Sequence, residues 1–346
     1  MLEAFFNRIP RDILKHVENL ELKVSSERCR HDIDDLLART VLIGGKRLRP
    51  LLTFLFGRTF LLSTEQTHLY ATSIEMVHAA SLAHDDVIDQ ATTRRGKPSI
   101  NAESSNKRAV LAGDYLLADV IMGLTKAGNL ELVSEMANVI YQLSLGEWLQ
   151  LDASEDREYS REIIEKIALA KTSSVMSWCS LAPATLANLP TQSREQAKLF
   201  GHHLGLAFQM IDDALDFSQT GESFKDQYLD LENGIVNSVV FRWLEKDHEL
   251  FSSFKSGENL QAIVTSRLER GLPSELELSI SEVRSEAREH LESARSLLDQ
   301  ICREFHSSYE KQTGRNLSEE KADLKMHQSG REAVEFILDY LAKRTY

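Results

Sequence analysis

Apolar side chains recur along this chain at intervals of three and four residues, as in the runs Ile13, Val17, Leu20 and Ile33, Leu36, Leu37. That spacing places them on one face of a helix, whereas strands alternate apolar and polar positions. The pattern predicts long helices and no regular strands. The longer predicted helices cover residues 51–62, 64–90, 109–125, 130–151, 161–189, 193–217, 235–250, 257–271, 274–305 and 331–346.

Breaks in this helical pattern are few, since the chain of 346 residues contains only six prolines. Pro183 predicts a kink or break within 161–189. The polar stretch 218–233 is expected to be a loop, and residues 306–330 an exposed polar connection. No domain boundary is evident. We therefore expect one all-α domain over 1–346, a single large helical bundle with a central active-site cavity between facing helices.

Three carboxylates, Asp85, Asp86 and Asp89, interrupt the apolar helix predicted over 64–90. Positions i and i+4 share a helix face, so Asp85 and Asp89 are expected side by side, with Asp86 about 100° round. No Lys or Arg lies within a turn of them. Like charges at this spacing repel one another unless a cation is supplied, and Mg²⁺ prefers such oxygen ligands.

The same motif returns as Asp212, Asp213 and Asp216 near the end of the helix predicted over 193–217. One copy could be acidic residues favoured in the first turn of a helix. Two copies in apolar surroundings, without a local counter-charge, instead predict two acid clusters that face each other and hold metal ions. Metal ions with nearby Arg and Lys suit diphosphate chemistry.

Charge and composition limit the class of partner. The formal net charge is −13, which argues against nucleic acid, because binding it needs a basic stripe. Basic residues cluster locally in the segments 44–50 and 94–98, which favours a small anionic ligand. No apolar run reaches the length of a membrane span, the N-terminus does not resemble a signal peptide, and three scattered cysteines suggest a reducing compartment. We expect a cytoplasmic protein.

Seven short motifs follow one another along the chain, at 44–50, 85–89, 94–98, 113–115, 146–150, 171–172 and 208–216, and His78 stands between the first two. In these motifs, and from about Asp32 onward, the sequence resembles the trans-type polyprenyl diphosphate synthases, relatives of farnesyl, geranylgeranyl and octaprenyl diphosphate synthase. The motifs occur in the order that is typical of this family, and His78 matches as a single residue.

The resemblance implies an all-trans head-to-tail (1′-4) condensation of isopentenyl diphosphate with geranyl, farnesyl or geranylgeranyl diphosphate. It implies three Mg²⁺ ions coordinated by Asp85, Asp89 and Asp212, with Asp86, Asp213 and Asp216 in support. The remaining implied roles are contacts to the allylic diphosphate by Arg94, Lys171 and Lys225, to isopentenyl diphosphate by Lys46, Arg49, His78 and Arg95, and to the allylic cation by Thr172 and Gln209. Glu147 and Gln150 are either site residues or plain polar core groups.

Product length is expected to depend on the positions before Asp85. Short-chain relatives place aromatic residues there, whereas this chain has Ala80 and Ser81, which predicts a product of C20 or longer. Tyr141, Trp178 and Met122 are candidates for a deeper floor.

One position departs from the family, because Ile235 stands where a lysine is usual. A non-catalytic or regulatory subunit of a heteromeric synthase therefore remains an alternative, and a class I terpene cyclase is another. Synthases of this kind usually form homodimers, which we also expect here.

Overall fold

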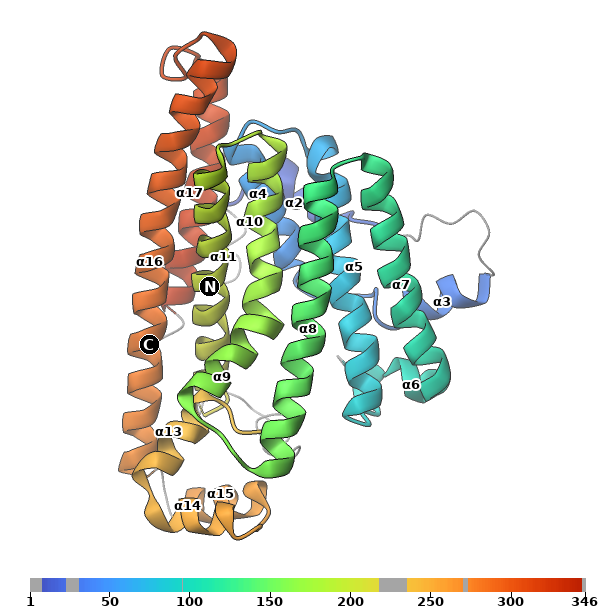
Figure 1. The fold of residues 1–346 in the computed structure, drawn as a ribbon, viewed down its shortest axis with the longest axis vertical. Helices are drawn as coiled ribbons and strands as arrows, with labels where there is room; N and C mark the ends of the chain where they lie inside the picture. Colours follow the sequence, from blue (N-terminus) through green and yellow to red (C-terminus); the bar gives the residue numbers. More distant parts are fainter. Residues whose placement is uncertain (1–7, 23–30, 95, 218–234, 270–272, 344–346) are drawn as a thin grey trace. The chain divides into compact units, whose positions relative to one another are not determined.

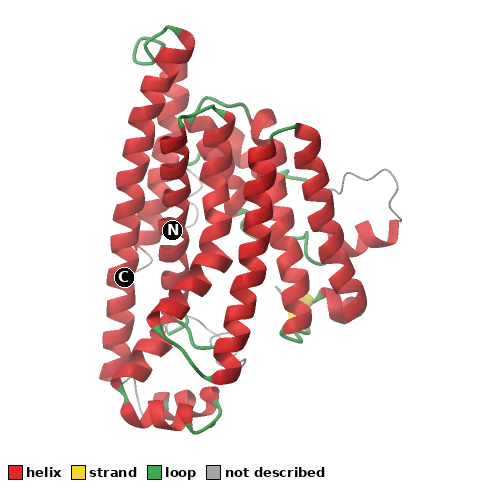
Figure 2. Ribbon diagram, viewed as in Figure 1, coloured by secondary structure: helices red, strands yellow, loops and turns green. Residues whose placement is uncertain are grey.

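The computed structural model describes residues 8–22, 31–94, 96–217, 235–269 and 273–343. Helices account for most of these residues, so the all-α prediction is confirmed (Figure 2). In chain order the elements are α2 (Arg11–Glu18), α3 (His31–Arg39), α4 (Leu48–Thr59), α5 (Thr64–Ile88), β1 (Thr93–Arg94), β2 (Lys97–Pro98), α6 (Ile100–Glu103), α7 (Asn106–Ala127), α8 (Leu130–Asp156), α9 (Arg161–Ala168), the π-helical turn η1 (Leu169–Ser173), α10 (Ser174–Leu186), α11 (Thr191–Leu215), α13 (Ser238–Lys246), α14 (His248–Lys255), α15 (Leu260–Leu268), α16 (Ser274–Thr313) and α17 (Lys321–Lys343).

The chain forms two compact units, which are described separately. Unit 1 comprises residues 1–141, 175–201 and 297–336, and unit 2 comprises residues 142–174, 202–296 and 337–346. Helices α8, α10, α11, α16 and α17 have residues in both units. The expectation of one domain over 1–346 stays a prediction.

Unit 1 is built around α5, which packs against α4 and α7 (Figure 1). Its first turn is closed by a capping box, in which Ser63 accepts from the Gln66 amide and the Gln66 side chain accepts from the Ser63 amide. The core around α4 is aromatic, with Phe56 and Phe200 in edge-to-face contact at 5.0 Å between ring centroids. Trp178 lies fully within this core and donates from its indole to the Tyr70 carbonyl at 3.0 Å.

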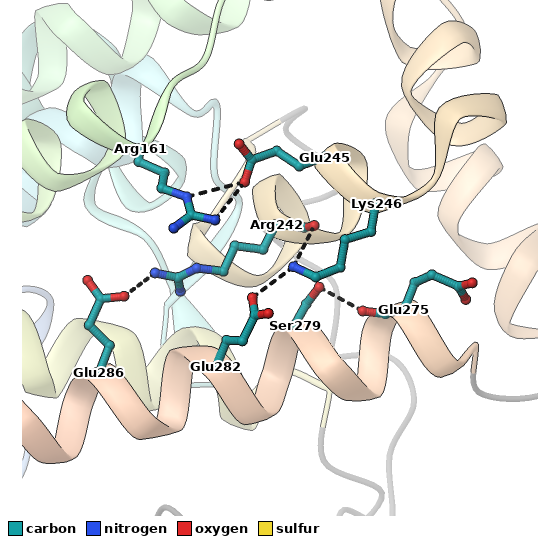
Figure 3. A network of polar contacts seen from close by, with 8 residues as sticks. All are labelled: Arg161, Arg242, Glu245, Lys246, Glu275, Ser279, Glu282 and Glu286. Carbon is teal, nitrogen blue, oxygen red and sulfur yellow. Dashed lines mark hydrogen bonds and ion pairs between the residues drawn. The ribbon is translucent and has the colours of Figure 1, made fainter.

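Unit 2 holds α13 in place through charged side chains from two other helices (Figure 3). Arg242 of α13 pairs with Glu286 of α16, and Lys246 pairs with Glu282 at 2.7 Å. Arg161 of α9 reaches Glu245 at 3.1 Å. Arg242 is 7% exposed, so its pair is screened less by solvent than the others. These contacts hold α13 in place within unit 2, and with it Ser238, the first residue of the helix.

Several boundaries differ from the sequence prediction. The range 306–330 is mostly helical, since α16 continues to Thr313 and α17 starts at Lys321. The connection outside helices is limited to residues 314–320, where most side chains are exposed, as predicted, and Leu317 is buried. Pro183 lies inside α10, so the helix does not break there, and the alternative of a kink stays a prediction. The range 235–250 divides into α13 and α14, because Asp247 caps the second helix through the amides of Glu249 and Leu250.

Candidate functional site

The first acid motif occupies the C-terminal end of α5. The Asp89 amide bonds to the Asp85 carbonyl at 2.8 Å, so the helical geometry continues to the end of the motif. Asp85 is therefore on the same face as Asp89, as predicted. Asp85 is half-buried and Asp89 exposed. These two carboxylates are accessible from one side of the helix, which suits the binding of a divalent cation.

The middle carboxylate of this motif has a different environment. Asp86 is completely buried, and its Oδ1 accepts a hydrogen bond from Arg94 Nε at 2.7 Å. The hairpin of β1 and β2 turns back at Gly96 and brings Arg94 to the helix. The expectation that this acid cluster has no local counter-charge is therefore wrong. The prediction considered only residues within one helical turn of the acids, whereas Arg94 lies on the hairpin that follows the helix.

The second acid motif, at the end of α11, repeats this arrangement. Its Asp216 amide bonds to the Asp212 carbonyl at 3.2 Å, which again places positions i and i+4 together. Asp212 is exposed and Asp216 half-buried, whereas Asp213 is only 4% exposed. In both motifs the outer pair is accessible and the middle aspartate is buried. Each outer pair therefore presents carboxylate oxygens, which are the ligands that hard divalent cations prefer.

Both oxygens of Asp213 are engaged by protein groups. Oδ2 accepts from the Ser238 amide at 2.9 Å and from the Ser238 hydroxyl at 2.6 Å, and Oδ1 accepts from Gln209 Nε2 at 2.9 Å. Burial raises the pKa of Asp213, and the bonds from Ser238 and Gln209 oppose that effect. Asp213 therefore ties α11 to the start of α13. Asp86 and Asp213 are thus alike, since each is buried and hydrogen-bonded to protein side chains.

Lys171 and Thr172 lie in η1, the single π-helical turn between α9 and α10. The sequence predicted one helix over 161–189 with a kink or break at Pro183, so a π turn at residues 169–173 was not expected. A π turn contains one residue more than an α turn, and such turns occur often at functional sites. Because of it, the helical pattern of α9 is out of phase with that of α10.

The segment 146–150 on α8 faces this turn. Lys171 Nζ donates to Glu147 Oε2 and, at 3.1 Å, to Gln150 Oε1. A Cβ on Gly146 would lie 2.6 Å from Lys171 Cγ and 2.9 Å from the Ala170 side chain, so the close approach requires glycine. Glu147 and Gln150 are therefore partners of Lys171, and the motif's glycine is explained by packing.

The Thr172 hydroxyl donates to Gln209 Oε1 at 2.8 Å. Both residues belong to unit 2 and are half-buried. The two side chains that the sequence assigned to one task are thus in direct contact.

The basic segment 44–50 comprises a tight turn over residues 44–47, with Gly44 and Gly45 at positive φ, and the first three residues of α4. Arg47 also has positive φ, and its guanidinium bonds to Glu75 Oε1 at 3.1 Å and to the Leu42 carbonyl at 2.6 Å. Glu75, 5% exposed, was not recognised from the sequence, although an acid in the apolar run of α5 was a signal for it. This ion pair holds the turn on α5.

The other predicted residues are distributed as follows. Lys46 is exposed, and Arg49 and His78 are half-buried in the same unit. Arg95 and Lys225 lie outside the described residues.

The positions predicted to set the product length differ in burial. Ala80 is completely buried, whereas Ser81 is half-buried and donates to the His78 carbonyl at 2.9 Å. Of the floor candidates, Trp178 is buried, and Tyr141 and Met122 are exposed.

Comparison with known families gives a match over most of the chain. A family model described as "Polyprenyl synthetase" matches residues 31–266. The region includes both acid motifs, the basic turn, the hairpin and η1. It ends before α16 and α17.

Individual relatives agree with this match. "Heptaprenyl diphosphate synthase component 2" of Geobacillus stearothermophilus is 34% identical over 245 residues, which cover 69% of this chain and 74% of that protein. "Solanesyl-diphosphate synthase 1, mitochondrial" of Oryza sativa subsp. japonica is 37% identical over 235 residues, or 66% of this chain. The match spans 53%, about half, of the rice protein.

A solved structure extends the likeness to the whole fold. The crystal structure of a decaprenyl diphosphate synthase from Rhodobacter capsulatus has a TM-score of 0.76 and covers 99% of each chain. The identity is 24%, so this comparison supports the fold alone.

Proposed function

The chain belongs to the polyprenyl synthetase family, and we propose that it is a magnesium-dependent trans-polyprenyl diphosphate synthase. It joins isopentenyl diphosphate head-to-tail to an allylic diphosphate. The observation that carries this proposal is the repeated acid motif. In each copy the outer aspartates are accessible, and the middle one is buried and hydrogen-bonded to protein side chains. A repeat of this kind serves diphosphate binding through metal ions.

Asp85, Asp89, Asp212 and Asp216 are the proposed metal ligands, and the number of Mg²⁺ ions is proposed to be three. When bound, the metal ions neutralise the diphosphate that leaves the allylic substrate. The chain itself supplies the carboxylates, already placed in pairs by helical spacing. Arg94 and Asn101 keep Asp86 and its helix end in position, through the bonds to the Asp86 side chain and carbonyl.

The basic side chains divide between the two substrates. Lys46, Arg49, His78 and Arg95 are proposed for isopentenyl diphosphate, and Arg94, Lys171 and Lys225 for the allylic diphosphate. Lys171 is held by Glu147 and Gln150, so its ammonium is already oriented before any anion arrives. Charge-assisted bonds from such groups to phosphate oxygens are stronger than neutral ones.

Thr172 and Gln209 are proposed to face the allylic cation with their oxygens. The double bond of isopentenyl diphosphate attacks this cation, and a proton is then lost, with the departing diphosphate as its acceptor. Polar oxygens fixed before reaction stabilise positive charge without the cost of reorganising. The heptaprenyl and solanesyl names of the relatives support a product of C20 or longer.

We further propose a homodimer. Val110, Leu111 and Met122 of α7 are exposed apolar side chains, which a second copy of α7 could cover. Among the described residues, no helix is long and apolar enough to cross a membrane. A cytoplasmic location stays a prediction, and the rice relative is named as mitochondrial.

The test is product analysis with the purified protein, Mg²⁺, labelled isopentenyl diphosphate and each of geranyl, farnesyl and geranylgeranyl diphosphate. A prenyl series ending at one long chain supports the proposal. Diphosphate release from the allylic substrate alone would indicate a cyclase. No elongation by a folded protein would indicate a subunit that needs a partner, and the word "component" in the name of the Geobacillus relative makes that control worthwhile.

A further inference from the structure

Four side chains of unit 2 form a continuous series of hydrogen bonds, which we call the Ser238 relay. It runs from Ser238 on α13 to Asp213 and Gln209 on α11 and ends at Thr172 in η1. The donor-to-acceptor distances are 2.6, 2.9 and 2.8 Å. Ser238 is 7% exposed and Asp213 4%, so solvent has little access to the first link.

The relay fixes which way the Gln209 amide points. A carboxylate only accepts hydrogen bonds, so Asp213 requires the Nε2 side of the amide. The Oε1 side then faces Thr172, whose hydroxyl has to donate to it. With the proton of Thr172 committed to Gln209, the lone pairs of its oxygen point away from Gln209 and are available to positive charge.

Ser238 in turn fixes Asp213. Its amide and hydroxyl both donate to Oδ2, which leaves Oδ1 for Gln209. Without the hydroxyl, Oδ2 keeps one donor, and the carboxylate gains freedom to rotate about its last bond. The position of Ser238 is itself secured, because Asn237 caps α13 and the ion pairs of Arg242 and Lys246 anchor the helix to α16 (Figure 3).

We propose that Ser238 is a positioning residue for the reaction, which acts through Asp213 and Gln209 to direct the oxygen of Thr172. The inference rests on the proposed synthase activity. Loss of the Ser238 hydroxyl is predicted to lower the rate of the chemical step and to leave the binding of isopentenyl diphosphate unchanged, because none of the residues proposed to contact isopentenyl diphosphate belongs to the relay.

The experiment compares Ser238→Ala, Ser238→Thr and the control Ser279→Ala in steady-state elongation assays. Ser279 is a completely buried serine of the same unit, whose hydroxyl donates to the Glu275 carbonyl at 2.7 Å (Figure 3). Ser238→Ala is expected to lower kcat about 10- to 100-fold, with KM for isopentenyl diphosphate within about twofold of wild type. Ser238→Thr, which keeps the hydroxyl, recovers most of the activity, and Ser279→Ala stays near wild type.

A double-mutant cycle with Thr172→Val separates positioning from general loosening. If the relay acts through Thr172, Ser238→Ala has little further effect on kcat in the Thr172→Val background. Multiplication of the two losses, an equal loss in Ser279→Ala, or wild-type kcat in Ser238→Ala would each overturn the inference. If Ser238→Ala does not fold, Ser238→Cys, with a weaker donor, is assayed in its place and is expected to give a partial loss.

The two proposals fail differently. An inactive wild-type protein contradicts the synthase function, whereas an active wild-type protein with an unaffected Ser238→Ala variant contradicts the relay alone.

Discussion

Arg94 donates from Nε to Asp86 Oδ1 across 2.7 Å, and this contact joins the hairpin of β1 and β2 to the end of α5. The Asp86 side chain is fully buried, whereas that of Arg94 is 29% exposed. The pair therefore does two things. It compensates a buried carboxylate, and it attaches the hairpin to the end of α5 that carries the acid motif.

Arg94→Ala is expected to lower the free energy of unfolding by about 1–3 kcal/mol, because the Asp86 carboxylate loses its charged partner in a buried position. Urea unfolding followed by circular dichroism measures this. The control is Lys97→Ala on β2, an exposed position where a change within about 0.5 kcal/mol is expected. Equal stability of the two variants would show that Asp86 does not depend on Arg94.

Asp85→Ala and Asp212→Ala are each expected to reduce kcat by about 100- to 1000-fold while the fold is retained. Neither side chain is in the core, so the loss is of charge stabilisation in the reaction and not of packing. Incorporation of labelled isopentenyl diphosphate gives the rate, and the exposed Asp35 on α3 supplies the control Asp35→Ala. Near-normal turnover of either variant would refute its role as a metal ligand.

Ser81→Phe and Ala80→Phe are both expected to shorten the product, since each adds an aromatic ring one turn before Asp85. They differ in stability, because Ala80 is completely buried and Ser81 half-buried. Overpacking at Ala80 costs about 1–3 kcal/mol, visible as a lower Tm. Chromatography of the products tests the first statement, with Ala102→Phe at an exposed position of α6 as control. An unchanged product from both variants would mean that the prenyl tail takes another route.

Leu111→Glu is expected to weaken the proposed homodimer, because it puts a charge on the exposed apolar face of α7. Sedimentation velocity at several protein concentrations measures the association. Lys126→Glu, which adds negative charge at an exposed position near the end of the same helix, controls for net charge. Monomeric wild-type protein at all concentrations would contradict the dimer itself.

Acid should destabilise the protein through His327. Burial lowers the pKa of this histidine to about 4 and outweighs the hydrogen bond of 2.6 Å between its Nδ1 and the Thr59 carbonyl, which acts in the opposite direction. The unfolded chain takes up the proton near pH 6.5 and the folded one only near pH 4, so stability falls as the pH decreases between these values. The full effect is on the order of 3 kcal/mol. His306, whose pKa burial also lowers, contributes in the same direction.

The measurement is the difference in unfolding free energy between wild type and His327→Gln at pH 7 and pH 4.5. Glutamine retains an amide donor for the Thr59 carbonyl but does not titrate, so other acid effects cancel in the difference. The wild type is expected to lose more stability than the variant. Parallel losses would show that His327 is not the group responsible.

Long helices could be predicted from the sequence because their apolar periodicity extends over many turns. For α5 the predicted range 64–90 ends only two residues beyond the observed helix, Thr64–Ile88. The outer aspartates were found for the same reason, since i and i+4 are neighbours on any α-helix. The fold class followed from this periodicity, whereas the family was indicated by the resemblance of the short motifs.

Contacts between segments that are joined by turns or loops could not be predicted from the sequence. Arg94 reaches Asp86 by the reversal at Gly96, and Ser238 reaches Asp213 from a position 25 residues along the chain. Neither spacing corresponds to a helical repeat. The π turn was missed as well, because one additional residue in 161–189 leaves the apolar pattern on each side intact and only shifts its phase.

That shift has a consequence for how this region can vary in length. Deleting one residue from Leu169–Ser173 would convert the π turn into an ordinary α turn, and because the π turn holds just one residue more, α9 and α10 would keep nearly the same orientation about the helix axis. The residues inside the turn would move, so that Lys171 and Thr172 would not both keep their places opposite Glu147 and Gln209. A deletion here should therefore leave the fold intact and damage the site, whereas a deletion in the middle of α10 would rotate one part of that helix by about 100° against the other.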